Sequence, residues 1–313
     1  MTDGYVLMHE HLFLNMMRDH RGDGLIHDPE LVASELIDFY DAGGRCLVDV
    51  TPAELTREAH LNGITDCGCL VPSVSRCRHN VAAIQEVSGR SGVQVILGTG
   101  RYREPYLDGR WIDQVRVEEL AEIFITDLTH GFGETAVRAG VLGEIGSDHW
   151  YVSAREERVL RAAAVASRET GALIITHAAR WPIGLQQLEL LTGLGVEPER
   201  ICVGHADLVP SPEYHRQIGA TGAYLAFDTI RGLSDWELRR RLAWIRELVD
   251  SGYADRLVLS HDVCRRSHLR RYGGSGFTYL LREFRTAFLE SGLPEALFEQ
   301  FTIHNARRAL NLS

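Results

Sequence analysis

Several features that would assign this chain of 313 residues to a specialised class are missing from it. No apolar run approaches the length that a membrane-spanning helix needs. The first residues, MTDGYVLMHEHLF, lack the basic start and long apolar stretch of a secretory signal. The six cysteines are scattered, which does not indicate a disulfide framework. We therefore expect no membrane association, and free thiols in the reducing cytoplasm.

Basic residues are also fewer than acidic ones. The chain has 33 basic residues against 43 acidic ones, which gives a formal net charge of −10. This negative net charge argues against a protein that binds nucleic acid or an anionic membrane through its overall electrostatic field. It does not restrict a small substrate, because a local cluster of arginines can oppose the overall sign. A small molecule is therefore the partner that we expect.

Internal repeats, low-complexity tracts and linkers are absent as well, so we predict one domain over residues 1–313. Residues 52–80 are the unusual stretch, because they are polar and carry three of the cysteines. Cys67, Cys69 and Cys77 lack a clean second ligand pair, which makes a zinc knuckle the weaker interpretation. We interpret 52–80 as a loop insertion at an active site.

What the sequence does contain is one alternating pattern. Short apolar runs that end in Gly, His or Asp are each followed by a segment with helical spacing. The predicted strands are Tyr5–His9, Cys46–Thr51, Val93–Gly98, Ala139–Glu144, Leu173–His177, Ile201–His205, Ala223–Phe227 and Leu257–Ser260. The predicted helices are Pro29–Ala42, Val115–Thr129, Glu156–Thr170, Ile183–Leu194, Ser234–Asp250, Gly276–Ser291 and Pro294–Leu310.

Eight strands that alternate with helices predict either a closed parallel barrel or an open doubly wound sheet. Gly98-Thr99-Gly100 is a fragment of a dinucleotide-binding fingerprint, but the third glycine is missing at the needed spacing. The strand count and this absence favour the barrel. We therefore predict an α/β fold of the (β/α)₈ TIM-barrel type.

Polar residues end several of the predicted strands, and in a TIM barrel the chemistry lies at these carboxyl ends. His9 and His11 are two positions apart, so they point the same way while Glu10 points to the other face. A lone histidine at a strand end is more often structural than a ligand, and we interpret His20, His27, His60, His79, His130 and His215 in that way. Four histidines and two carboxylates at one rim, in contrast, predict a site for one or two divalent metal ions. These six residues are His9, His11, Glu144, His177, His205 and Asp262.

Five motifs include all of these residues except His177, together with Tyr102: Met8-His9-Glu10-His11-Leu12, Gly98-Thr99-Gly100-Arg101-Tyr102, Gly143-Glu144-Ile145-Gly146, Val203-Gly204-His205, and Leu259-Ser260-His261-Asp262 through Arg271-Tyr272-Gly273-Gly274. In this order they resemble the amidohydrolase superfamily and, within it, the phosphotriesterase-like family. The resemblance covers nearly the whole chain. The nearest subgroup is that of the phosphotriesterase homology proteins, in which a glutamate replaces a carboxylated lysine as the bridge between two metals.

The resemblance implies which of the six residues would bind each metal ion. His9, His11 and Asp262 would hold a buried metal, whereas His177 and His205 would hold a more exposed one. Glu144 would bridge the two ions, which we expect to be zinc, with manganese, cobalt or iron as alternatives. Asp262 would also carry the proton, and Tyr102 would lie beside the substrate. The resemblance further suggests a homodimer.

One departure from the phosphotriesterases concerns a neighbour of this set, and a separate question is the direction of His261 and Asp262. Thr229 follows Asp228 where the phosphotriesterases have a distal histidine, so their proton relay is not expected here. His261 and Asp262 must point to opposite faces, and the family pattern puts Asp262 inward. Organophosphate hydrolysis is therefore in doubt, while the hydrolase core is intact.

An arginine-rich loop follows the last strand, with four arginines in residues 265–271. Such a run is either a basic segment exposed to solvent or a loop whose arginines bind an anionic group of the substrate. Under the second interpretation Arg231, Arg265 or Arg266 binds a carboxylate, phosphate or sulfonate of the substrate. Equal loss for anionic and neutral substrates in arginine variants would contradict it.

Together these observations predict a binuclear hydrolase that uses a metal-bridging hydroxide to cleave a small carboxyl ester or lactone, with or without an anionic group. Among enzymes, the alternative is an amidase for N-acyl amino acids or sulfonates, or a phosphotriesterase. The alternative outside enzymes is a barrel that binds a ligand without turnover.

Overall fold

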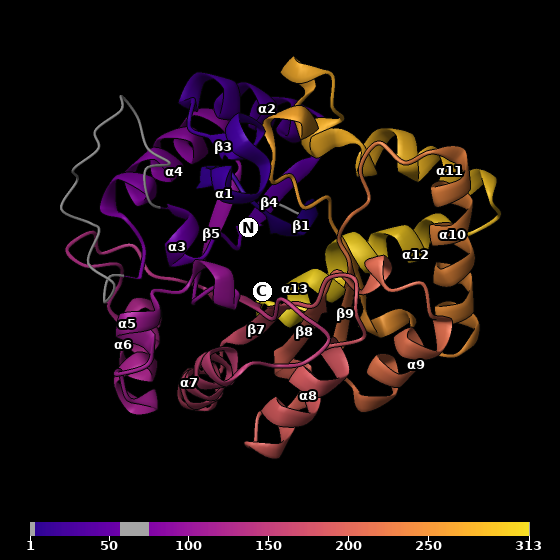
Figure 1. Cartoon of the computed structure of the whole chain (residues 1–313). Coiled ribbons are helices and arrows are strands. Elements are labelled where there is room, and N and C mark those ends of the chain that lie inside the picture. The colour runs from indigo at the N-terminus through magenta and orange to yellow at the C-terminus, as the bar shows by residue number, and fades with distance from the viewer. Residues whose placement is uncertain (1–3, 57–74, 313) are drawn as a thin grey trace.

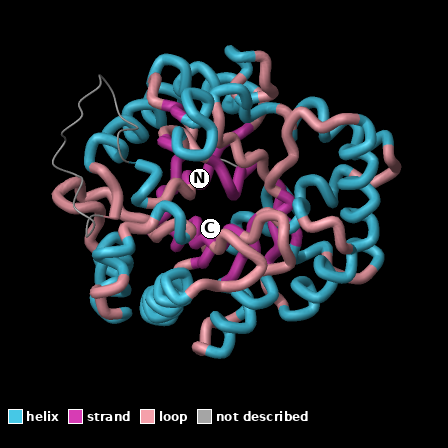
Figure 2. Tube along the Cα trace, in the orientation of Figure 1, coloured by secondary structure: helices cyan, strands magenta, loops and turns pink. Residues whose placement is uncertain are grey.

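The structure is a computed structural model that describes residues 4–56 and 75–312. Eight parallel strands form a sheet in the order β1-β4-β5-β6-β7-β8-β9-β10, and Figures 1 and 2 show them as an inner ring with most helices outside it. This confirms the predicted α/β barrel. The strands are β1 (Tyr5–Glu10), β4 (Gly44–Asp49), β5 (Gln94–Thr99), β6 (Val141–Gly146), β7 (Leu173–His177), β8 (Ile201–Gly204), β9 (Tyr224–Phe227) and β10 (Leu257–Leu259).

The first and last strands meet at a seam that polar groups close. The Asp262 amide donates a hydrogen bond to the His9 carbonyl over 3.1 Å. The Glu10 carboxylate accepts from the Ser260 hydroxyl and from the amides of residues 261 and 263, at 2.8 to 2.9 Å. Glu10 is fully buried, so these bonds compensate the loss of its hydration. The seam thereby fixes the ends of β1 and β10 beside each other.

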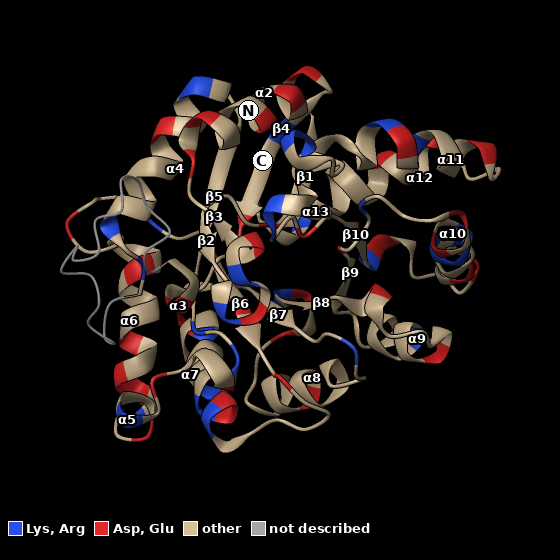
Figure 3. Ribbon diagram, turned by 45° about the horizontal axis from the view of Figure 1, so that its top comes forward, with Lys and Arg blue, Asp and Glu red and all other residues tan. Residues whose placement is uncertain are grey.

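Helices cover the outer face of the strands, and many begin at a side-chain cap. Asp28 caps α2, and Ser153 and Ser234 form capping boxes at the starts of α7 and α10. Figure 3 shows charges of both signs on α10 and α11. The bounds are α2 (Pro29–Asp41), α3 (Ala53–Thr56), α4 (Arg78–Ser91), α5 (Gly109–Ile112), α6 (Val117–Thr129), α7 (Ala154–Thr170), α8 (Gly184–Gly193), α9 (Pro212–Thr221), α10 (Asp235–Asp250), α11 (Arg285–Glu290), α12 (Glu295–Glu299) and α13 (Asn305–Ala309).

The buried apolar residues form two clusters, as the alternation of side chains along strands requires. The smaller cluster includes Val6, Val48, Ile175 and Val258, together with Ala306 of α13. The larger one lies between the strands and the helices and contains Leu7, whose neighbours in the chain belong to the smaller cluster. The strands are therefore apolar on both faces, which is why they read as continuous hydrophobic runs in the sequence.

Three parts of the fold were not expected from the apolar pattern. Helices α4 and α9 are present, and α4 begins at Arg78, inside the predicted 52–80 insertion. A small antiparallel pair, β2 (Leu14–Asn15) and β3 (Leu25–Ile26), follows β1 and carries helix α1 (Met17–His20) between its strands. Cys67 and Cys69 of the weaker zinc-knuckle interpretation lie outside the described residues.

Among the described residues, we find no helix that has both the length and the apolar character to cross a membrane.

Candidate active site

Five of the six predicted ligands converge around one carboxylate, Glu144 at the end of β6. The second carboxylate oxygen of Glu144 lies 2.7 Å from His177 Nδ1, 3.4 Å from His205 Nε2 and 3.5 Å from His9 Nε2. Its first oxygen lies 3.6 Å from His11 Nε2. The sixth residue, Asp262, approaches His11 Nε2 to 3.4 Å. The structure thus brings all six residues together at the carboxyl ends of five strands.

The donor set fits divalent metal ions. Two groups that share Glu144 have all their ligand atoms within 4.8 Å of one another: His9 with His11, and His177 with His205. Ligand atoms on a tetrahedral zinc ion are about 3.3 Å apart, close to most of the spacings here. His205 Nε2 and His177 Nδ1 face each other at 2.9 Å, and His9 Nε2 lacks a hydrogen-bond partner among the described residues. Buried nitrogens in this arrangement suit cations rather than each other.

Asp228, which follows β9, orients histidines of both groups. One of its oxygens lies 2.9 Å from His9 Nδ1, and the other lies 2.8 Å from His205 Nδ1. The His205 amide also donates to this carboxylate over 3.1 Å. Both imidazoles consequently turn Nε2 toward Glu144, as ligands oriented by an outer carboxylate do. Sequence reasoning treated Asp228 only as the residue before Thr229 and missed this role.

Charge in the cluster favours ionised carboxylates. Burial raises the pKa of Glu144, but His177, His205 and His9 outweigh it and hold that pKa well below its usual value. Burial likewise raises the pKa of Asp262, and Arg231 with neighbouring histidines brings it below the ordinary range. Arg231 Nη1 lies 3.4 Å from the Asp262 carboxylate. Asp262 is therefore a carboxylate at neutral pH.

The inward position of Asp262 depends on an unusual backbone. Asp262 has a φ of 54° and His205 a φ of 55°, the left-handed region that residues other than glycine rarely adopt. Each such residue costs of order 1 kcal/mol and is typical of functional sites. His261, on the other face, donates through Nδ1 to Glu10 and accepts the Leu280 amide at 2.9 Å. It therefore supports the seam of the barrel and stays away from the cluster.

The close approach of two strands requires a glycine before His205. A Cβ atom at Gly204 would lie 2.0 Å from the carbonyl oxygen of Thr176 in the neighbouring strand β7. Any side chain there would push β8 away from β7 and separate His205 from His177. The glycine-histidine pair that the sequence shows is thus a requirement of strand packing.

Tyr102, after β5, lies beside the cluster. Its hydroxyl is 3.4 Å from His177 Nδ1, and only 2% of the residue is exposed. Burial is the main cause that raises the pKa of Tyr102 well above its usual value, so the phenol keeps its proton. Glu54 of α3 fixes this segment by accepting the Tyr102 amide at 3.0 Å and pairing with Arg101. Tyr102 can therefore serve as a hydrogen-bond donor in the cavity.

A cavity of about 710 Å³ opens above the cluster. Its floor includes His11, Glu144, His177, His205 and Asp262, and its walls come from the loops that follow the strands. The other lining residues are Met16, Arg18, Asp19, His20, Tyr102, Arg103, Ser147, Asp148, His149, Ala179, Arg180, Trp181, Leu208, Arg231, Cys264 and Arg265. The size suits a small molecule.

The predicted arginines fall into two groups. Arg231 and Arg265 line the cavity, and Arg231 also donates to the His261 carbonyl. The buried Nε of Arg265 lacks a hydrogen-bond partner among the described residues. Arg266 is outside the cavity lining, with its guanidinium 4.6 Å from the ring centre of Tyr272. The prediction for Arg266 therefore needs correction, because its side chain packs on a tyrosine outside the site.

Sequence reasoning also missed part of the cavity wall. Residues 16 and 18–20, on and just before α1, line the cavity, although His20 was interpreted as structural. Arg103 pairs with Asp19 and Asp148, which ties this segment to the loops after β5 and β6. Strands of two residues, such as β2 and β3, leave no periodic signal that could have predicted this arrangement.

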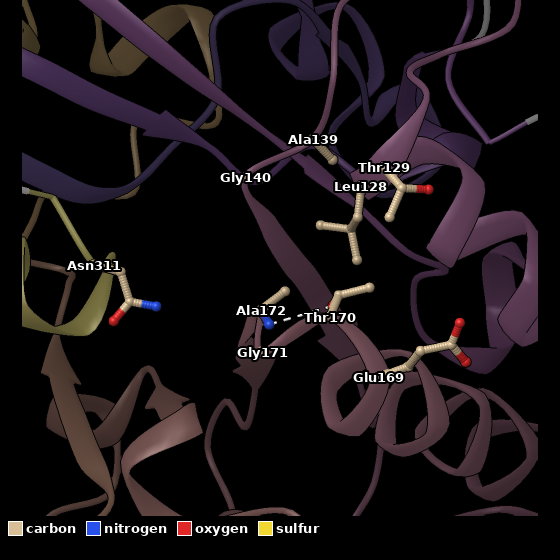
Figure 4. Close-up of a pocket in the computed structure, with 9 residues that line it drawn as sticks. All are labelled: Leu128, Thr129, Ala139, Gly140, Glu169, Thr170, Gly171, Ala172 and Asn311. Carbon is tan, nitrogen blue, oxygen red and sulfur yellow. Dashed lines mark hydrogen bonds between the residues drawn. The ribbon is translucent and has the colours of Figure 1, made fainter.

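The opposite end of the barrel has a hollow of its own, of about 480 Å³. Figure 4 shows its lining at the start of β6 and around the end of α7, with Glu169 and Asn311 on separate sides. The carboxylate of Glu169 meets no cluster of histidines in the described part of the chain. The candidate ligands of the described chain thus lie at the carboxyl ends of the strands, as expected for this fold.

The sequence contains no lysine at all, so all 33 basic residues are arginines. A carboxylated lysine is consequently impossible at the bridging position, and Glu144 is the residue that lies between the two histidine pairs. This arrangement agrees with the glutamate-bridged subgroup that the sequence motifs resemble.

Comparison with known proteins points to one family. The model of the phosphotriesterase family matches residues 70–310. The phosphotriesterase homology protein of Escherichia coli is 31% identical over 94% of this chain and 93% of its own length. Its crystal structure, with phosphate in the active site, superposes with a TM-score of 0.85 at 30% identity, covering 97% of both chains.

Two further relatives are named for hydrolysis. Mouse N-acetyltaurine hydrolase is 26% identical over 89% of this chain and 76% of its own. A lactonase from Listeria monocytogenes superposes with a TM-score of 0.84 at 25% identity, covering 99% of this chain and 95% of that one. The family model, the extent of the Escherichia coli match and the shared barrel lead to one conclusion: this chain belongs to the phosphotriesterase family.

Proposed function

We propose that this protein is a metal-dependent hydrolase that cleaves a small carboxyl derivative carrying an anionic group. The observation that carries the proposal is the buried cluster of four histidines and two carboxylates at the floor of a 710 Å³ cavity. Hydrolases among the relatives support it. The ester or lactone is the first candidate bond, as in the Listeria lactonase.

Two divalent ions, zinc before manganese, cobalt or iron, are the proposed cofactors. His9, His11 and Asp262 would hold one ion, His177 and His205 the other, and Glu144 would bridge them. The pairing of histidines around the two oxygens of Glu144 supports this division only in part, because His9 lies nearer the oxygen that faces His177 and His205. When bound, such ions activate water at neutral pH and polarise a carbonyl oxygen.

The protein's own groups would then handle the proton and orient the substrate. Asp262 would accept the proton of the attacking water and return it to the leaving group. Tyr102 would donate a hydrogen bond to the oxygen on which negative charge develops, because its hydroxyl is protonated and faces the cavity. Arg231 would keep Asp262 ionised through their 3.4 Å contact.

The arginines support an anionic substrate. Arg265 lines the cavity with a buried Nε that has no hydrogen-bond partner in the described residues, and the nearby Arg231 adds a second positive charge. The phosphate in the active site of the Escherichia coli relative shows that a related cavity accepts a tetrahedral anion. A carboxylate, sulfonate or phosphate of the substrate would take this place.

An amide is the second candidate bond. The same arginines would suit the sulfonate of an N-acyl amino sulfonate or the carboxylate of an N-acyl amino acid, and N-acetyltaurine hydrolases of several vertebrates are among the relatives. Metal-activated water attacks esters and amides by the same route, so the floor of the cavity alone does not distinguish them.

The test combines metal analysis with a substrate panel. Protein purified without chelators should contain close to two divalent ions per chain, and its activity should disappear on chelation and return with zinc or manganese. The panel should contain lactones, aryl esters, N-acyl amino acids, N-acyl amino sulfonates and a phosphotriester, each in anionic and neutral forms where chemistry allows. The highest kcat/KM should belong to an anionic carboxyl derivative. Far fewer than two ions per chain, or no hydrolysis on the whole panel, would contradict the proposal.

The cytoplasm as compartment and a homodimer as assembly are part of the same proposal. Three cysteines in the described residues, Cys46, Cys202 and Cys264, are free and buried, which supports a reducing compartment. Light scattering on the purified protein would measure the assembly.

A further inference from the structure

Exposed apolar side chains gather on one side of the cavity mouth. Eleven large apolar residues are exposed in the described chain, and four of them lie on the consecutive loops after β6, β7 and β8. Single exposed apolar residues are ordinary, but a group of them marks a binding surface. We call these four residues the apolar lip: Trp150, Tyr151, Trp181 and Leu208.

The members of the lip differ in one important respect. Trp181 and Leu208 line the cavity, whereas Trp150 and Tyr151 lie outside its lining. Trp181 remains 47% exposed and Trp150 65% exposed. The inner half of the lip is therefore continuous with the space above the histidines, and the outer half provides a natural comparison.

A strained turn presents Trp181 to the cavity. Arg180 has a φ of 72°, and the Trp181 amide donates to the Ala179 carbonyl over 2.9 Å, closing a three-residue turn around it. Turns of this kind are rare and strained, and such strain is typical of functional sites. Pro182 follows and restricts the backbone of Trp181 to extended conformations. The ring is thus held on a stiff segment, which reduces the entropy lost when a ligand packs on it.

The opposite side of the mouth is basic. Arg231 follows β9, Arg265 follows β10, and Arg18 follows β1, so these arginines lie on segments after three strands that are consecutive around the ring beyond β8. The histidine cluster lies on the floor between the two sides. A substrate whose scissile bond lies over that floor therefore meets Trp181 and Leu208 beside the single arginine Arg180 in one direction, and Arg18, Arg231 and Arg265 in the other.

We infer that Trp181 is a specificity-determining residue that packs against an apolar group of the substrate, while the anionic group faces Arg231 and Arg265. The substrate class is an amphipathic carboxyl derivative, with an acyl chain of several carbons or an aryl ring at one end and an anion at the other. This inference rests on the proposed function, since it describes the substrate of the same cavity. The continuity of Trp181 with the cavity lining favours the substrate over a second copy of the chain as its occupant.

The experiment measures binding, so that it does not depend on turnover. Hexane-1-sulfonate and methanesulfonate carry the same anion and differ only in apolar length. Their dissociation constants are measured by calorimetry on the metal-loaded protein and on its W181A, W181F and W150A variants. Wild type should bind the hexyl compound about fivefold or more tightly than the methyl one, because apolar contact with an indole ring contributes on this scale. W181A should bring the ratio below about twofold, while W181F and W150A should preserve it.

Three outcomes would overturn the inference: an unchanged ratio in W181A, a parallel loss for both sulfonates, or an effect of W150A as large as that of W181A. An equal effect of W150A together with a change in molecular mass by light scattering would identify the lip as an interface between copies. The proposed function fails separately, through absent metal or absent hydrolysis, and neither result alters the ratio of the two dissociation constants. W181F also guards against misfolding, since it keeps an aromatic ring in the same turn.

Discussion

The two ends of the barrel offer hollows of comparable size and very different content. The hollow at the carboxyl ends of the strands measures about 710 Å³ and the one at the amino ends about 480 Å³. The first is lined by five histidines, several acids and five arginines, whereas the second is lined by small or uncharged side chains and the single charge of Glu169. Volume alone therefore does not distinguish a site from a gap between packed elements.

The two ends differ in what their left-handed backbone residues do. At the carboxyl ends, left-handed residues such as His205 and Asp262 turn side chains inward at a cost in conformational energy. At the amino ends, Gly171 ends α7 in a left-handed C-cap that satisfies the helix and directs nothing toward a ligand. Asn311, which lines the amino-end hollow, is also left-handed with a φ of 53°, but it follows the end of α13 and asparagine tolerates this region better than most residues. The left-handed residues thus end helices at one end of the barrel and carry proposed ligands at the other, as expected when function and stability occupy separate ends of a fold.

The largest effect should come from Asp262, the proposed proton carrier at the carboxyl end. D262N keeps the size of the side chain but removes the base, so kcat should fall by about 1000-fold. Metal content by elemental analysis should stay near that of wild type, because five ligands remain. Activity within tenfold of wild type would show that Asp262 does not carry the proton.

Asp228 should follow, because it orients histidines of both proposed metal pairs. D228N should weaken metal affinity by about 10- to 100-fold, the usual loss when an outer carboxylate is removed. Competition with a chelator of known affinity measures it. Because Asp228 contacts His9 and His205, both ions should be affected, and loss of only one would contradict this shared role.

Arg265 should have the next effect. R265A should raise KM for an anionic substrate about tenfold, since a charge-assisted hydrogen bond is lost, and should leave KM for a neutral analogue unchanged. R266A is the matched control one residue away, and because Arg266 packs on Tyr272 it should leave both values unchanged. If the two variants behaved alike, the basic loop would act only through its overall charge.

The smallest effect should come from the other end of the barrel. Glu169 is an exposed residue in the amino-end hollow, and E169Q should leave kcat/KM within about twofold of wild type. A large loss of activity with unchanged thermal stability would break the comparison between the two ends and would assign a function to the second hollow.

Much of the fold was predictable because the strands are apolar on both faces and end in polar residues. All eight strands were predicted within a few residues, and the prediction that Glu10 points away from His9 and His11 agrees with its place at the seam. The small pair β2 and β3 was not predictable, since two residues per strand carry no periodicity. Their position over the cavity explains why Arg18 and His20 were overlooked as lining residues.

The cluster was predictable to the extent that strand ends reveal it. His9, Glu144 and His177 end apolar runs, and the barrel brings such ends together. Asp228 gives the same signal, an acid after a strand, yet only the contacts with His9 and His205 distinguish an orienting residue from a ligand. The sequence also could not predict whether Arg265 or Arg266 lines the cavity. Consecutive residues in a turn have no fixed periodicity that would assign the direction of their side chains.

The seam between β1 and β10 has a consequence for the order of events during synthesis. The proposed ligands His9 and His11 are synthesised about 250 residues before Asp262 and the backbone groups that Glu10 binds. The site therefore cannot be complete on a nascent chain that lacks its last strand. Loading with metal becomes a late step that follows closure of the ring, and a truncation before residue 262 would leave the first strand without its partner.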